Sequence, residues 1–156
     1  MMKECAVYFD LDGVLVDWVA QFEKVSPISL EEMNAMSHEE RAVFKRQLYS
    51  YEFFAEMAPI ERGVEMLKRM MAEKPEADFF ILSAAGYENQ EEVMRAKRDW
   101  CAKHLPAGIK EVLLVPKLKH KPAAMKEGYR DQVLIDDRVP AIEYWQEAGG
   151  IGVLFV

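Results

Sequence analysis

Five short apolar runs, separated by longer segments in which apolar residues recur at helical spacing, constrain the fold of this chain most strongly. The runs are continuous rather than alternating in polarity, which is typical of parallel strands that are covered on both faces. They occupy residues 4–10, 77–83, 111–115, 132–136 and 151–156. We therefore expect five parallel strands.

Helical patterns fill most of the gaps between these runs. Residues 61–73, 88–104 and 139–148 carry apolar side chains three or four positions apart, and Gly149 and Gly150 end the last of these helices. Strands that alternate with helices imply right-handed crossover connections. The fold class that follows is α/β, with an open Rossmann-like sheet.

One long segment breaks the alternation, because residues 18–57 contain no strand pattern. Two candidate capping boxes predict helices there, Ser29 with Glu32 and Ser37 with Glu40. A long excursion within a compact domain is usually a lid or a binding element. We predict a small helical cap at residues 18–57 and a core domain made of residues 1–17 and 58–156.

The charge balance excludes several classes of partner. The 156 residues include 20 Lys and Arg against 27 Asp and Glu, for a net charge of −7. Such a surface repels nucleic-acid backbones and anionic membranes. We expect no nucleic-acid or membrane partner, and a protein that acts as a monomer or a homodimer.

The location of the protein is also predicted from the sequence. The apolar runs are too short to cross a bilayer, and the first residues lack a signal-peptide pattern. Cys5 lies in an apolar run and Cys101 in a helical pattern, which favours two buried thiols over a disulfide. We expect a cytoplasmic protein.

Pairs of carboxylates follow two of the predicted strands. Asp10 and Asp12 come after the first strand, next to Gly13, and Asp136 and Asp137 end the fourth. The carboxyl ends of parallel strands meet at one edge of the sheet, where open α/β folds bind ligands. Turn formation and helix capping each explain single residues of this set. Both pairs together favour a hard cation, and Mg²⁺ over Ca²⁺.

Two further strand ends carry polar groups. Ser83 ends the second strand before a turn of small residues that begins with Ala84. The serine hydroxyl and the following backbone amides suit phosphate oxygens, although Ser is also a common helix cap. After the third strand come Lys117, Lys119 and Lys121. A solvated basic loop and a phosphate-binding lysine are both open interpretations.

Taken in order, these elements resemble the four motifs of the haloacid dehalogenase-like (HAD) hydrolase superfamily. Within it the chain is similar to the 5′(3′)-deoxyribonucleotidase branch. The residues that carry this second resemblance are Phe53-Phe54, Pro59, Gly63, Leu67, Trp100, His104 and Leu105.

The resemblance implies a sheet in the order 5-4-1-2-3 and assigns roles to the motif residues. Asp10 is expected to be the nucleophile and Asp12 the general acid and base. Mg²⁺ is expected to be held by Asp10, Asp12, Asp136 and Asp137. Ser83, Ala84 and one lysine are expected to bind phosphate; Lys119 fits best by spacing, Lys121 second and Lys117 third.

Aromatic residues of the insert form a candidate substrate pocket. Trp18, Phe53 and Phe54 suit stacking on a nucleobase, although such residues more often form the small core of the insert itself. The leading hypothesis is a Mg²⁺-dependent phosphomonoester hydrolase that forms an aspartyl-phosphate. Its expected substrate is a small phosphorylated molecule, a 5′-nucleotide and particularly a deoxynucleotide. Alternatives are a phosphatase of small sugar or metabolite phosphates, a phospho-accepting receiver-like domain, and a non-catalytic phosphate-binding module.

Overall fold

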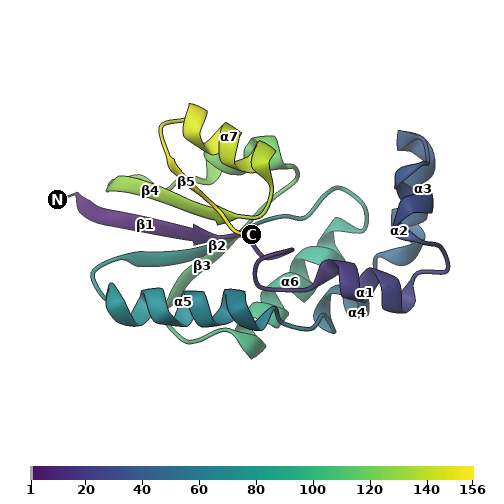
Figure 1. The fold of residues 1–156 in the computed structure, drawn as a ribbon, viewed down its shortest axis with the longest axis horizontal. Coiled ribbons are helices and arrows are strands. Elements are labelled where there is room, and N and C mark those ends of the chain that lie inside the picture. The colour runs from purple at the N-terminus through teal and green to yellow at the C-terminus, as the bar shows by residue number, and fades with distance from the viewer. Residues whose placement is uncertain (1) are drawn as a thin grey trace.

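The five apolar runs form one parallel sheet in the computed structural model, which describes residues 2–156 (Figure 1). The strands run in the order β3-β2-β1-β4-β5, which is the expected 5-4-1-2-3 order read from the other edge. They are β1 (Lys3–Phe9), β2 (Asp78–Ala84), β3 (Ile109–Val115), β4 (Tyr129–Asp136) and β5 (Ile151–Leu154). The predicted fold class is confirmed.

Two strands begin two or three residues earlier than predicted. β3 starts at Ile109 and β4 at Tyr129, through residues that are partly exposed. Parallel pairing with the neighbouring strand holds these residues, as where Tyr129 pairs with Lys3. Backbone hydrogen bonding extends a strand beyond its apolar run, because it does not depend on side-chain polarity.

Both faces of the sheet are covered, which explains why the runs are continuous. Val7 and Phe9 belong to the core beneath α5 (Glu61–Glu73) and α6 (Gln90–His104). The alternate residues Ala6 and Tyr8 belong to a second core on the other face. That face carries the 3₁₀ helix η1 (Leu118–Ala124) and α7 (Val139–Glu147), and Figure 1 shows α7 and α5 on opposite sides of the sheet.

Four helices and no strand fill the segment between the turn after β1 and α5. They are α1 (Trp18–Val25), α2 (Leu30–Asn34), α3 (His38–Leu48) and α4 (Tyr51–Ala55). Both predicted capping boxes form, at the starts of α2 and α3. Figure 1 shows these helices beyond the carboxyl ends of the strands. The Trp100 indole donates a hydrogen bond to the Met57 carbonyl at 2.8 Å, which fastens the end of this insert to α6.

Close packing beside the first strand depends on Gly63 of α5. A Cβ at this position would lie 1.7 Å from the Val14 carbonyl oxygen. The missing side chain lets α5 rest directly on the turn that follows β1. This contact positions the turn that carries the first carboxylate pair.

The two cysteines are free thiols, as predicted, but only Cys101 is buried. Burial raises the pKa of the Cys101 thiol to about 12. Cys5 is half-buried, because it lies near the start of β1, before that strand enters the core. Within residues 2–156 no helix has the length and apolarity that crossing a membrane requires.

Candidate active site

The turn after β1 brings the two carboxylate pairs together. The Asp10 amide donates to the Ile135 carbonyl at 2.9 Å, so the chain still runs beside β4 at this point. Gly13 then adopts a φ of +88°, and a Cβ there would lie 2.1 Å from Asp137 Oδ2. Glycine is therefore required both by the backbone conformation and by the close approach of Asp137.

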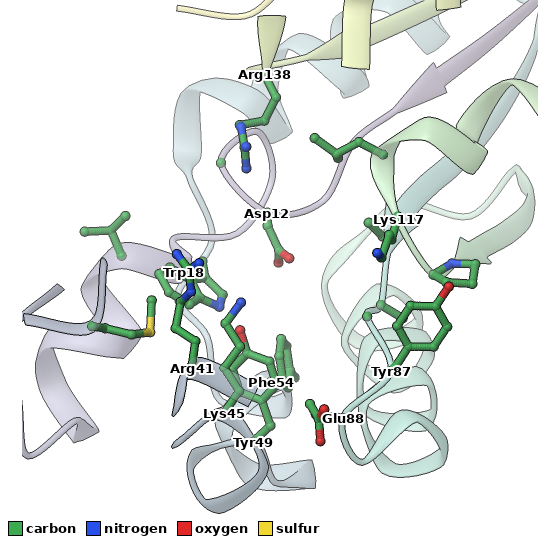
Figure 2. A pocket seen from close by; sticks show the side chains of 18 of the residues that line it. Asp12, Trp18, Arg41, Lys45, Tyr49, Phe54, Tyr87, Glu88, Lys117 and Arg138 are labelled. Atoms are coloured by element: carbon green, nitrogen blue, oxygen red, sulfur yellow. The ribbon is translucent and has the colours of Figure 1, made fainter. Parts of the chain in front are cut away.

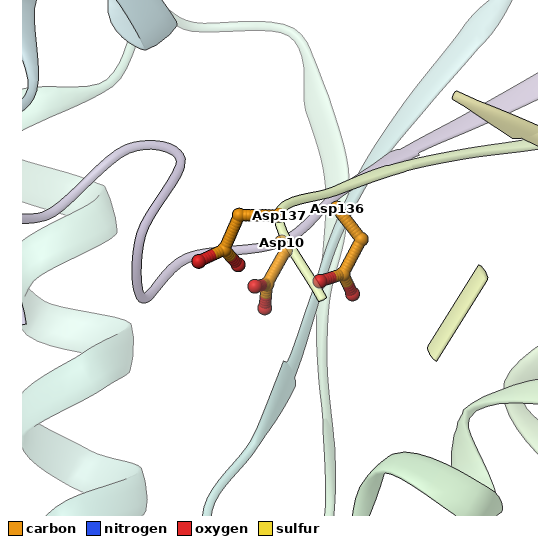
Figure 3. Close-up of side chains that lie close together, drawn as sticks. All are labelled: Asp10, Asp136 and Asp137. Carbon is orange, nitrogen blue, oxygen red and sulfur yellow. The ribbon is translucent and has the colours of Figure 1, made fainter. Parts of the chain in front are cut away.

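Three carboxylates converge at the carboxyl ends of β1 and β4. Oxygens of Asp10, Asp136 and Asp137 all lie within 4.8 Å of one another (Figure 3). Burial raises the pKa of Asp10 well above its ordinary value, and the charges of Asp136 and Asp12 raise it further. Clustered carboxylates of this kind need cations to remain ionised.

Lys121 supplies one such cation. Its ammonium is fully buried and lies 2.9 Å from Asp10 Oδ1 and 2.7 Å from Asp136 Oδ2. Burial lowers the pKa of Lys121, but attraction to these two carboxylates outweighs it, so the net shift is upward. Lys119, which fits best by spacing, is exposed to solvent. Lys117 lines the same large cavity as Asp10 and Asp12. In η1 the lysines point in different directions, so spacing alone does not identify the inward one.

The first pair has its own lysine, which the sequence analysis missed. Lys97 of α6 is 1% exposed, and its Nζ lies 2.9 Å from Asp12 Oδ2 and 2.8 Å from Ser83 Oγ. A signal was present, because Lys97 lies four residues after Val93 and three before Trp100, on the apolar face of the helix. A lysine at such a position is buried, and a buried lysine needs a partner.

The carboxylate oxygens fit a divalent cation. Asp12 Oδ1 and Asp137 Oδ1 are buried and have no hydrogen-bond partner within the described chain. Asp136 differs, because its Oδ2 accepts from Lys121 and its Oδ1 from the Arg138 amide. Burial raises the pKa of Asp137, and the Asp136 charge adds to this effect. An oxygen-binding ion at the cluster of Asp10, Asp136 and Asp137 would satisfy Asp137 Oδ1 and offset the excess negative charge.

A cavity of about 820 Å³ opens in front of these groups (Figure 2). Asp10, Asp12 and Asp137 line it on the sheet side, and Trp18 and Phe54 line it on the insert side. This volume is within the usual range for small-molecule sites.

Among the residues that the structure describes, Phe53 is not one of those that line this cavity. It packs against the rings of Trp18, Tyr49 and Phe54 and lines a second cavity of about 370 Å³. Tyr87, by contrast, is 59% exposed and lines the large cavity, with the Lys117 ammonium 5.7 Å from its ring centre. No sequence pattern marks Tyr87 as a site residue, since it is a lone tyrosine in a turn.

The turn after β2 differs in part from the expected phosphate cradle. Ala84 lines the cavity, and Ser83 is fully buried next to Lys97. The amides of Ala85 and Gly86, however, donate to the carbonyls of Val115 and Pro116. These two amides hold the end of β3 and are not available to phosphate.

Comparison with known proteins yields one family and a set of similar folds. Residues 4–156 match the model of the family described as 5′ nucleotidase, deoxy (pyrimidine), cytosolic type C protein. No curated protein sequence matches the chain.

Three solved structures illustrate the similarity in fold. A haloacid dehalogenase-like hydrolase from Streptococcus pneumoniae superposes with a TM-score of 0.63 at 14% identity, covering 98% of this chain and 85% of that one. The HAD-hydrolase YfnB from Bacillus subtilis, bound to magnesium, gives 0.58 at 13% identity, with 98% and 87% covered. A HAD family enzyme from Bacteroides thetaiotaomicron, in complex with magnesium and inorganic phosphate, gives 0.56 at 13% identity, with 97% and 93% covered.

Proposed function

Because the chain belongs to the 5′ nucleotidase, deoxy (pyrimidine), cytosolic type C family, we propose that it hydrolyses nucleoside 5′-monophosphates with Mg²⁺, through an acyl phosphate on Asp10. It is a phosphatase of the hydrolase class. The family description names a cytosolic protein, which supports a cytoplasmic location for this chain.

The observation that carries the proposal is the arrangement of the carboxylates at the cavity. Asp10 accepts a hydrogen bond from the Lys121 ammonium. Asp12, two residues further along the turn, has one carboxylate oxygen bound to Lys97 and the other unpartnered. One carboxylate can thus act as nucleophile while the second moves protons at the same face of the substrate. We further propose that residues 18–57 act as a cap over a core of residues 1–17 and 58–156.

The reaction proceeds in two steps. An Asp10 oxygen attacks phosphorus and forms a bond to it, while the bond from phosphorus to the ester oxygen breaks. Protonated Asp12 gives its proton to the departing oxygen. Asp12 then takes a proton from a water molecule, which attacks the acyl phosphate, releases inorganic phosphate and restores Asp10. Each transfer of this kind contributes about 10²- to 10⁴-fold to the rate.

The remaining groups hold the reacting atoms in place. Asp10, Asp137 and the Asp12 carbonyl would hold Mg²⁺, which shields the carboxylates from the phosphate charge and stabilises the charge of the transferring phosphoryl group. Asp136 accepts one hydrogen bond at each oxygen, from Lys121 and from the Arg138 amide, and we propose that its main role is to orient Lys121. The Lys121 ammonium lowers the pKa of Asp10 and so opposes the larger effect of burial, and Lys97 keeps the Asp12 carboxyl directed toward the site.

The test is turnover of a panel of deoxynucleotides, ribonucleotides and sugar phosphates, with and without Mg²⁺. We expect release of phosphate from nucleoside 5′-monophosphates only with Mg²⁺, and its loss in Asp10→Asn. The matched control is Asp131→Asn, because Asp131 lies near the opposite end of β4 and pairs with Arg130.

Other outcomes would point elsewhere. Preferred hydrolysis of sugar phosphates would support the metabolite phosphatase. A stable phosphoprotein without turnover would indicate a receiver-like domain, and binding of phosphate without either reaction would indicate a non-catalytic module. Activity retained in Asp10→Asn would contradict the assignment of the nucleophile.

A further inference from the structure

Three cationic side chains reach the large cavity from outside the phosphoryl site described above. Arg41 and Lys45 come from α3 of the insert, and Arg138 follows β4 in the core. Figure 2 shows the ends of Arg41 and Lys45 directed toward the space below Arg138, beside Asp12. Cations from two separate parts of the fold therefore border the same space.

These cations lack the partners that neighbouring charges have. No carboxylate in the described residues forms an ion pair within 4.0 Å of Arg41, Lys45 or Arg138. Arg46, one residue after Lys45, is paired with Glu88 at 2.8 Å. Within α3, the cations without an ion pair are therefore Arg41 and Lys45, the two that line the cavity.

The shifted pKa of Lys45 shows that its positive charge is destabilised in this position. Lys45 is half-buried, and burial lowers the pKa of its ammonium. The charges of Arg41 and Arg138 lower this pKa further, and the charge of Glu88, which lines the same cavity, acts in the opposite direction without reversing the shift. Like charges gathered in a partly desolvated place are unfavourable unless an anion joins them, and the rest of this chain has an excess of acidic groups.

The position of α3 is fixed by polar contacts as well as by two partly buried side chains, Phe44 and Leu48, that pack against the core. None of its residues is buried. Its last turn is instead held by Asn89, whose side-chain amide donates to the carbonyls of Arg46 at 2.8 Å and Tyr49 at 2.7 Å. Asn89 takes a left-handed backbone conformation to do so, with φ of 49°. Contacts from the core thus hold the last turn of α3 at the place where its cations meet the cavity.

We propose that the substrate is a phosphomonoester whose leaving group carries a second anionic group, a phosphate or a carboxylate, bound by Arg41 and Lys45 opposite Arg138. The proposal rests on the proposed function for the phosphate that reacts, which Lys121 and the carboxylate cluster serve. Among nucleotides it favours nucleoside 3′,5′-bisphosphates over 5′-monophosphates. Each charge-assisted hydrogen bond to the second anion suffices for about 10-fold in affinity.

The experiment compares two matched pairs of substrates. One pair is deoxyadenosine 3′,5′-bisphosphate and deoxyadenosine 5′-monophosphate, which tests a phosphate. The other is 3-phosphoglycerate and glycerol 3-phosphate, which tests a carboxylate. We expect the second anion to raise kcat/KM by about 10- to 100-fold in at least one pair, mainly through KM.

Variants locate the effect. Arg41→Gln combined with Lys45→Gln is expected to abolish the advantage while leaving kcat for p-nitrophenyl phosphate within about twofold. The control is Lys24→Gln, an exposed residue of α1 in the same insert that lines neither described cavity. Equal kcat/KM within both pairs, or an advantage that persists in the double variant, would overturn the proposal.

A binding measurement separates this inference from the proposed function. If no monoester is hydrolysed, the proposed function fails, and calorimetry on Asp10→Asn then compares the affinities of the bisphosphate and the monophosphate. Tighter binding of the bisphosphate that is lost with Arg41 and Lys45 supports the second anion site. Equal affinities exclude it.

Discussion

Lys97 is a site residue whose role only the structure reveals. Its ammonium joins the Asp12 carboxylate to the Ser83 hydroxyl, with the Phe54 ring centre 5.1 Å away. A buried cation with two fixed partners holds those partners in one geometry. Asp12 therefore presents one fixed oxygen and one unpartnered oxygen, and Lys97 is a positioning residue for it.

Replacement of Lys97 by Met tests this role, because Met keeps the length and apolar contacts of the lysine stem. We expect kcat to fall by about 10²-fold or more, since a misdirected general acid loses most of its contribution, while KM changes little. Steady-state kinetics measure both parameters, and circular dichroism checks that α6 persists. Lys103→Met, at an exposed position of the same helix, is the control. An unchanged kcat would remove Lys97 from the site.

At the scale of elements, α5 and the turn after β1 form one unit. The backbone of α5 at Gly63 touches the Val14 carbonyl, and the Ile60 amide donates to the Leu15 carbonyl at 2.8 Å. The turn that begins at Asp10 is thus supported from below by a helix far along the chain. Its geometry depends on a contact with no room for a methyl group.

Gly63→Ala should therefore lower the free energy of unfolding, although alanine is the better helix former. The propensity gain is about 1 kcal/mol, and insertion of an atom against a fixed backbone costs about 1–3 kcal/mol. We expect a net loss of up to about 2 kcal/mol, measured by urea denaturation. Glu65→Ala, exposed on the same helix, is expected to change stability little. A more stable Gly63→Ala protein would show that α5 can shift away from the turn.

For the whole molecule, the carboxylate cluster links ion binding to folding. Asp10 and Asp137 lie far apart in the sequence, and only the folded chain brings their oxygens together. An ion that binds the folded state alone stabilises it by mass action, by about 2.7 kcal/mol at 100 times its dissociation constant. Removal of Mg²⁺ should then loosen the entire domain and not just the site.

Labelling of the Cys101 thiol measures this linkage. Its pKa of about 12 in the folded protein, against an ordinary value of 9.0, leaves almost no thiolate at mildly alkaline pH, so reaction with iodoacetamide requires unfolding. We expect Mg²⁺ to raise Tm and to slow this labelling, and Asp137→Asn to lose both effects. Mass spectrometry of the Cys101 peptide distinguishes it from Cys5. Labelling and Tm that ignore Mg²⁺ would argue against an ion at the cluster.

Much of the fold can be predicted from short-range patterns in the sequence. Apolar runs buried on both faces, helical spacing in 61–73, and the capping boxes at Ser29 and Ser37 each act over a few residues, so the sequence predicts them directly. The two carboxylate pairs were also predictable, because parallel strands place their carboxyl ends at one edge of the sheet. Ser83 and Asp12 follow from the same rule.

Only the tertiary structure decided which side chains meet. Lys121 rather than Lys119 reaches Asp10, Lys97 arrives from α6, and Phe53 turns into the packing of the insert rather than toward the cavity. These outcomes depend on how a helix is rotated about its axis and on what packs against it. Local sequence patterns predict strands and helices because backbone hydrogen bonds and burial act along the chain, whereas the partners of a buried charge are chosen across it.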